Sequence, residues 1–167
     1  SIDRTFSFGH WQANLLVEAF YTSLDDVFVL EKTGTDDAGN IIKERRNGNG
    51  ARVYGFNFDG KLAHGSSLSL QAGFTVQRSR YAEKESWSED PDVAPTKYMP
   101  RTPDCYGYFT LTSAPFRNFD FSLSGVYTGR MRVPHIAPDA SEIPAGYEYS
   151  YITKDELVHT PDFFELN

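Results

Sequence analysis

The sequence predicts an all-β chain, an antiparallel meander of about seven strands that forms part of a transmembrane β-barrel with alternating short turns and long loops. Three observations support this prediction. Apolar residues recur at every second position in several runs, whereas helical periodicity is hard to find. Aromatic residues make up 15% of the chain and Gly numbers 13, a composition that favours strands and turns. The connections between the runs alternate between short and long.

The clearest run covers residues 68–77. Successive side chains of a strand point to opposite faces, so this run has two chemically different faces. The apolar face carries Leu68, Leu70, Ala72, Phe74 and Val76, and the opposite face carries Ser69, Gln71, Gly73, Thr75 and Gln77. One face therefore requires an apolar environment and the other requires water or polar partners.

The other runs are expected in the following order along the chain. A short strand surrounds Phe6 and Phe8, and a second covers residues 14–30 with an interruption at Asp25 and Asp26. A third lies over residues 53–59 and leads into the run that begins at Leu68. Later strands are expected at residues 106–112, 119–128 and 161–167.

The connections between these strands alternate in length. Short ones are expected at residues 10–13, 60–66 and 113–118. Long ones are expected at 82–104 and 134–156, and after the second strand, where residues 34–40 form a loop and residues 47–50 a further turn or irregular edge. A single two-faced strand fits a half-buried sandwich as well as a barrel wall. A membrane barrel, however, has tight turns on one side and long loops on the other. Aromatic residues near the expected strand ends fit an interfacial girdle, namely Trp11, Tyr81, Tyr106 and Tyr127.

Composition excludes several classes of protein. The net charge of −7 argues against a nucleic-acid partner, and the one basic cluster, at residues 43–46, reads as a solvated loop. No apolar stretch reaches the roughly 18 residues of a membrane-spanning helix. Cys105 is alone and forms no internal disulfide. The chain begins in mid-pattern without a signal peptide, as expected for a piece of a larger protein.

No catalytic or metal-binding motif stands out, so we expect neither an enzyme nor a bound cofactor. The four His residues lie far apart in sequence, without the spacing of a zinc site. Asp25 and Asp26 are adjacent in a strand, so their carboxylates point to opposite faces and cannot share a proton.

The long loops are the expected recognition surfaces. Their aromatic side chains could stack on a sugar ring or a flat ligand, and Arg101 could anchor an anion. The candidate aromatic residues are Trp87, Tyr98, Tyr147 and Tyr149. Aromatic residues that only pack the loops against one another would look the same in sequence.

Several segments, in order, resemble the C-terminal half of the barrel of TonB-dependent outer-membrane receptors. They are residues 20–29 (FYTSLDDVFV), 46–47 (RN) followed by 51–57 (ARVYGFN), 98–103 (YMPRTP), 127–129 (YTG) and 159–164 (HTPDFF). In one place the chain departs from the family, since Gly55 is followed by Phe56 and Asn57 and lacks the expected Glu.

The resemblance implies a wide plugged barrel of about 22 strands. It also implies TonB-energised uptake of a bulky nutrient, such as a siderophore, cobalamin or glycan, across the outer membrane of a Gram-negative bacterium. Residues 1–167 would then be an internal barrel fragment without the plug domain and closing strand. Its partners would be outer-membrane lipid, the rest of the barrel and plug, TonB through the missing regions, and a small-molecule or glycan ligand.

Two other readings remain open. A soluble β-sandwich or β-barrel module that binds a carbohydrate or apolar ligand would bury the apolar faces in a core, and an enzyme is a more distant alternative. As an isolated fragment, the chain would leave unpaired backbone groups at both sheet edges and could associate with copies of itself.

Overall fold

A computed structural model describes residues 1–137 and 154–167, and these residues form strands, turns and loops without any helix. The predicted all-β fold is confirmed. None of the described residues belongs to a helix long and apolar enough to cross a bilayer. The strands are β1 (Ile2–Phe8), β2 (Trp11–Leu24), β3 (Phe28–Thr35), β4 (Ile41–Asn47), β5 (Ala51–His64), β6 (Leu68–Glu85), β7 (Thr96–Tyr98), β8 (Cys105–Phe116), β9 (Phe119–Thr128), β10 (Arg132–His135), β11 (Glu156–His159) and β12 (Phe163–Leu166).

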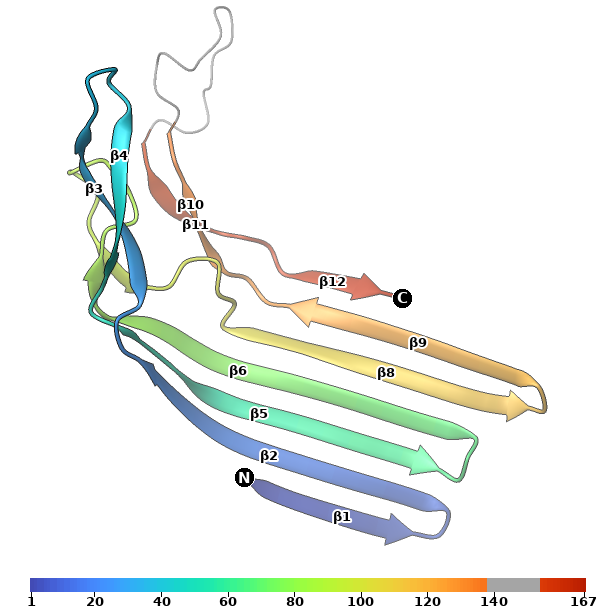
Figure 1. Cartoon of the computed structure of the whole chain (residues 1–167). Coiled ribbons are helices and arrows are strands. Elements are labelled where there is room, and N and C mark those ends of the chain that lie inside the picture. The colour runs from blue at the N-terminus through green and yellow to red at the C-terminus, as the bar shows by residue number, and fades with distance from the viewer. Residues whose placement is uncertain (138–153) are drawn as a thin grey trace, which may run out of the picture.

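The main sheet is an antiparallel meander with the order β1-β2-β5-β6-β8-β9-β12, and β7 pairs with β6 beside this path (Figure 1). The pairing of β2 with β5 runs without a bulge from Trp11↔His64 to Leu24↔Ala51. The next pair continues the same register, from His64↔Leu68 to Ala51↔Tyr81. Long strands in unbroken register keep the alternate apolar positions on one face, because a slip of one residue would exchange the faces.

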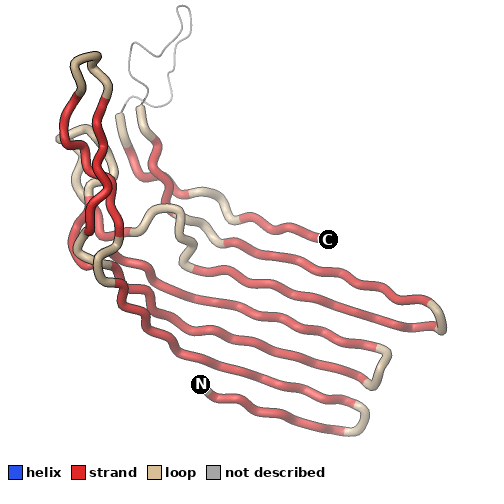
Figure 2. The backbone as a smooth tube through the Cα atoms, viewed as in Figure 1, coloured by secondary structure: helices blue, strands red, loops and turns tan. Residues whose placement is uncertain are grey.

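Short turns join the strands of this sheet at one end, and the long connections lie at the other (Figure 2). Each short turn contains a residue in the left-handed region: Gly9 (φ 63°), Gly65 (φ 51°) and Asn118 (φ 67°). Tight hairpin turns need such positive φ angles, which Gly and Asn adopt most readily. The predicted alternation of turns and loops is therefore present. The first turn, however, is only Gly9 and His10, because Trp11 already pairs with Phe8.

The structure corrects the second predicted strand, residues 14–30. It ends at Leu24, and residues Phe28–Thr35 pair instead with Ile41–Asn47 in a separate two-stranded sheet. Asp26 adopts φ 55°, which breaks the strand and redirects the chain. A second small sheet, β10 with β11, flanks the loop predicted at residues 134–156 and overlaps it only at its two ends. These hairpins extend the long connections beyond the main sheet (Figure 1).

The main sheet is a single layer with almost no core. Within the described residues, Ala51 is the buried hydrophobic residue, 1% exposed, and no large side chain is fully buried. A soluble sandwich would need a second sheet packed on the apolar face, and the described residues supply none. An open, two-faced antiparallel sheet is the geometry of a piece of barrel wall.

Candidate functional site

The apolar face of the main sheet is a continuous surface built from cross-strand rows. One row runs Val17↔Phe58↔Phe74↔Gly107↔Tyr127↔Phe164, and the next runs Leu15↔Gly60↔Ala72↔Phe109↔Gly125↔Leu166. Its large side chains are exposed: Phe74 is 42% and Phe164 53% accessible. Soluble monomers rarely expose apolar patches of this extent. This face therefore needs an apolar partner.

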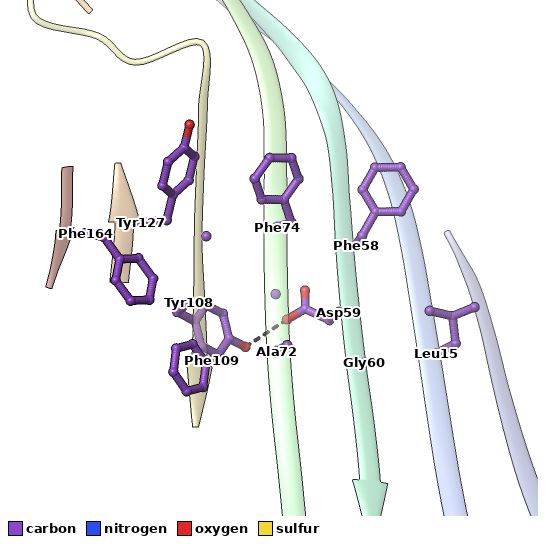
Figure 3. Close-up of a pocket in the computed structure, with 12 residues that line it drawn as sticks. Leu15, Phe58, Asp59, Gly60, Ala72, Phe74, Tyr108, Phe109, Tyr127 and Phe164 are labelled. Carbon is purple, nitrogen blue, oxygen red and sulfur yellow. Dashed lines mark hydrogen bonds between the residues drawn. The ribbon is translucent and has the colours of Figure 1, made fainter. Parts of the chain in front are cut away.

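A shallow groove of about 410 Å³ crosses this face (Figure 3). Small residues form its floor, because Gly60 and Ala72 stand between the larger Leu15 and Phe109 in one row. The rings of Phe74 and Tyr127 stack 6.4 Å apart at its edge, on either side of Gly107. The groove is lined by Leu15, Phe58, Asp59, Gly60, Ala72, Gly73, Phe74, Gly107, Tyr108, Phe109, Tyr127 and Phe164.

Aromatic side chains mark both ends of the apolar face. Trp11 lies beside the short turns, where its ring contacts that of His64 with centroids 4.7 Å apart. Tyr21 and Tyr54 stack at the opposite end, 6.4 Å apart. Tyr21 lies ten positions along the strand from Trp11 (21 − 11). At about 3.3 Å per residue and a tilt near 40°, this corresponds to a band about 25 Å tall, the height of the apolar band of membrane barrels.

The register changes the predicted girdle in part. Tyr106 pairs with Thr75 and Thr128 on the polar face, and Tyr81 pairs with Ala51 and shares the parity of Gln77. Tyr127 lies within the apolar band rather than at its boundary. Sequence position near a strand end does not reveal which face a residue occupies until the strand register is known.

The opposite face carries hydrogen-bonded polar side chains. The Tyr108 hydroxyl donates to Asp59 Oδ1 at 2.8 Å and accepts from Gln71 Nε2 at 3.0 Å. On the same face, Thr75 Oγ1 donates to Asn57 Oδ1 at 3.0 Å. These residues come from β5, β6 and β8, and the bond from Tyr108 to Asp59 spans β6, so the bonds tie three consecutive strands together across the polar surface.

The long connections bring together three of the predicted ligand-contacting residues. Trp87, Tyr98 and Arg101 line one cavity of about 390 Å³, together with side chains of the β3–β4 hairpin and Tyr81. Arg101 is exposed and adopts φ 59°, and its backbone N–H donates to the Arg132 carbonyl oxygen at 2.7 Å. A cavity with aromatic walls and an exposed guanidinium group is suited to a flat or anionic ligand.

The ring of Tyr98 is held between two guanidinium groups. The Cζ atom of Arg80 lies 3.8 Å from the ring centroid and that of Arg132 lies 3.6 Å from it. Two groups this close to one centroid must occupy opposite faces of the ring. Tyr98 therefore has no free face on which a ligand could stack, and any contact with a ligand would use its edge. Arg80 and Arg132 were not predicted, because neither has a motif or a sequence neighbour that signals the contact.

The β3–β4 hairpin is attached to the loop that follows β6. Lys43 Nζ lies 2.6 Å from Glu89 Oε1, and Asn49 Nδ2 donates to Glu83 Oε2 at 2.8 Å. A polar cavity of about 650 Å³ lies between these segments and is lined in part by Trp87. The basic cluster at residues 43–46, predicted as a solvated loop, thus belongs to β4 of this hairpin, and its Lys43 pairs with Glu89.

The remaining predicted residues contribute less to the described site. Tyr147 and Tyr149 lie outside the described residues. Within the described ranges, no group of three or more His, Cys, Asp or Glu side chains is placed to hold a metal ion.

His10 and His64, distant in sequence, meet with ring centroids 6.0 Å apart because the two turns that follow β1 and β5 are adjacent.

Comparisons with known proteins support the fold. No protein-family profile matches the chain, and no curated protein sequence matches it. Among solved structures, the chain is similar to the siderophore receptor PirA from Acinetobacter baumannii, with a TM-score of 0.54 and 16% sequence identity. The match covers 97% of this chain and 23% of the receptor, so the chain spans about a quarter of the length of that structure. At this identity the likeness concerns the fold alone.

Proposed function

We propose that this chain is part of the wall of an outer-membrane receptor that takes up a bulky nutrient. The observation that carries the proposal is the single-layer sheet with one continuous exposed apolar face and one hydrogen-bonded polar face. Lipid would cover the first face and an aqueous lumen the second. The similarity in fold to a siderophore receptor supports the same function.

The arrangement of connections supports an orientation in the membrane. In outer-membrane barrels the periplasmic turns are short and the extracellular loops are long. The turns at Gly9, Gly65 and Asn118 would then face the periplasm. The cavity around Trp87 and Arg101 would lie outside, where a ligand arrives first.

The finer parts of the proposal come from the family resemblance of the sequence segments. Transport would draw energy through TonB, and the ligand would be a siderophore, cobalamin or glycan. The plug, the remaining strands and the TonB contact would lie elsewhere in the full-length protein. The exposed edges β1 and β12 would then pair with neighbouring barrel strands rather than with a second copy of the chain.

An uptake experiment tests this function. Cells with and without the full-length gene would be supplied separately with labelled ferric siderophores, cobalamin and oligosaccharides. We expect uptake of one class to require the gene and to stop when the proton gradient is collapsed. Uptake that persists without the gradient would contradict energised transport. A full-length protein that stays monodisperse in buffer without detergent would contradict the membrane location itself.

A further inference from the structure

Three arginines, Arg52, Arg78 and Arg80, lie close together beyond Tyr21 and Tyr54, at the end of the apolar face near the long connections. Toward the long connections, the cross-strand row Tyr21↔Tyr54↔Arg78 is followed on the same face by the row Ser23↔Arg52↔Arg80. These positions have the same parity as Phe74 and Val76, and so they belong to the apolar face. We call these three residues, Arg52, Arg78 and Arg80, the arginine row. It therefore lies at the boundary of the apolar band that is marked by Tyr21 and Tyr54.

The arginine row carries positive charge that no carboxylate in the described residues neutralises. Arg52 and Arg80 are directly opposite each other on β5 and β6, where Cβ atoms are about 4.5–5.5 Å apart and like charges destabilise a sheet. Within the described ranges, none of the three arginines forms an ion pair with a carboxylate, whereas Lys43 pairs with Glu89. Glu83 lies near this end of β6, but it accepts a hydrogen bond from Asn49.

The geometry of the row suits an anion at the sheet surface. Arg52 and Arg78 are exposed. Arg80 is fixed in position, because its guanidinium group is stacked on Tyr98 with its Cζ atom 3.8 Å from the ring centroid. Guanidinium groups bind phosphate oxygens through paired, charge-assisted hydrogen bonds. A phosphate placed among them would relieve the repulsion between Arg52 and Arg80.

The groove lies on the same face as the arginine row and is nearer to the short turns. Arg78 lies six positions along β6 from Ala72 in the groove floor (78 − 72). At about 3.3 Å per residue and a strand tilt near 40°, the groove lies about 15 Å deeper in the membrane than Arg78. This depth is about half of the 30 Å hydrocarbon core, so acyl chains that start at the arginines would end beside the groove.

We propose that this face holds a phosphate-bearing lipid of the outer leaflet. Its phosphate group would bind to Arg52, Arg78 and Arg80, and an acyl chain would lie in the groove over Gly60 and Ala72. The charge of the arginine row selects an anionic headgroup, and the small residues of the groove provide a place for a chain. The inference rests on the proposed membrane location of the apolar face.

Lipid retention by the full-length protein in nanodiscs tests the inference. The nanodiscs would contain equal amounts of dimyristoyl phosphatidic acid and dimyristoyl phosphatidylcholine, which share their tails and differ in net charge. Native mass spectrometry would count the lipids that remain bound. We expect preferential retention of phosphatidic acid, and the double variant Arg52→Gln/Arg78→Gln should weaken it about tenfold or more. Arg117→Gln, exposed in the turn at the other end of the sheet, should leave retention unchanged.

A second variant tests the groove separately from the charge. A Cβ on Gly60 would meet no atom closer than the Ala72 carbonyl oxygen at 3.9 Å, so Gly60→Leu can fill the groove without a backbone clash. We expect this variant to lose affinity for dimyristoyl phosphatidic acid and to keep its affinity for the dihexanoyl form, whose chains are too short to reach the groove.

The outcomes separate this inference from the proposed function. A protein that inserts into nanodiscs but retains both lipids equally would overturn the lipid site and leave the membrane location intact. Equal retention by the wild type and the double arginine variant would do the same. A protein that does not insert would overturn both proposals.

Discussion

Phe74 on β6 lies against Gly107 on β8, its direct partner in the register. A Cβ on Gly107 would come within 2.8 Å of Phe74 Cδ2 and within 2.7 Å of the Gly73 carbonyl oxygen. The aromatic ring thus covers a position where the neighbouring strand has no side chain. Such aromatic cover over strand glycines helps to fix the register of a sheet.

We expect Gly107→Ala to destabilise the sheet by about 1–3 kcal/mol, the usual cost of forcing a group into an occupied space. The matched control is Gly60→Ala on the same face, where the nearest atom to the added Cβ is 3.9 Å away. Urea-induced unfolding of the full-length protein in lipid vesicles would measure both changes. Equal effects of the two substitutions would show that the Phe74 ring and the Gly73 carbonyl group can both move aside without cost.

Adjacent residues on β6 should respond oppositely to a charge. Phe74→Arg would place a guanidinium group in the lipid and should cost about 2–4 kcal/mol of unfolding free energy. Thr75→Arg would place it on the polar face and should cost only the hydrogen bond to Asn57, about 1 kcal/mol. The same unfolding measurement applies. A larger penalty for Thr75→Arg would mean that the two faces have been assigned the wrong way round.

Tyr98 should hold the base of the long loops through its two arginines. Tyr98→Leu removes the ring between Arg80 and Arg132, and two half-buried cation–π contacts contribute about 2 kcal/mol together. Amide hydrogen exchange of the full-length protein should become faster in residues 96–101 and in β10. Tyr98→Phe keeps the ring and should change exchange little. If amide exchange in Tyr98→Phe is as fast as in Tyr98→Leu, the contact depends on the hydroxyl group rather than on the ring.

The turn of the β3–β4 hairpin should loosen in acid. The side-chain amide of Asn40 donates to Asp36 and, with backbone N–H groups, lowers the pKa of this carboxyl below 3.8. Because the folded pKa is depressed, the stabilisation is present above pH 3.8 and is lost as pH falls through the folded value. The NMR shift of the Asn40 amide would report this transition. Asp36→Ala should abolish it, and an unchanged titration in that variant would exclude Asp36 as its source.

Much of the fold could be predicted from local pattern. The run at residues 68–77 forms the first part of β6, and the expected strand at residues 119–128 coincides with β9. Both alternate without interruption, and period two is a property that consecutive residues show by themselves. The hairpin of β3 and β4 was missed because Asp25 and Asp26 looked like a pause in one strand. Only the positive φ of Asp26 and the new pairing of Phe28 show that the strand ends there.

The candidate site depended more on long-range contacts. Trp87, Tyr98 and Arg101 were predicted from their residue types, and the fold places them around one cavity. The covering of Tyr98 by Arg132 joins residues 34 positions apart (132 − 98), and no local pattern signals it. The groove and the arginine row likewise arise from cross-strand register, which assembles each of these rows from three to six separate strands.

The sequence by itself determined that this chain forms strands with two different faces, joined alternately by turns and loops, because those properties depend on neighbouring residues. The tertiary structure decided which strands pair, which face each aromatic residue occupies, and that the sheet remains a single layer. These depend on register, and register places Gly60 beside Ala72 and Arg52 opposite Arg80. The physical reason is that a strand cannot specify its partner positions alone: they arise only when backbone hydrogen bonds align one strand with the next.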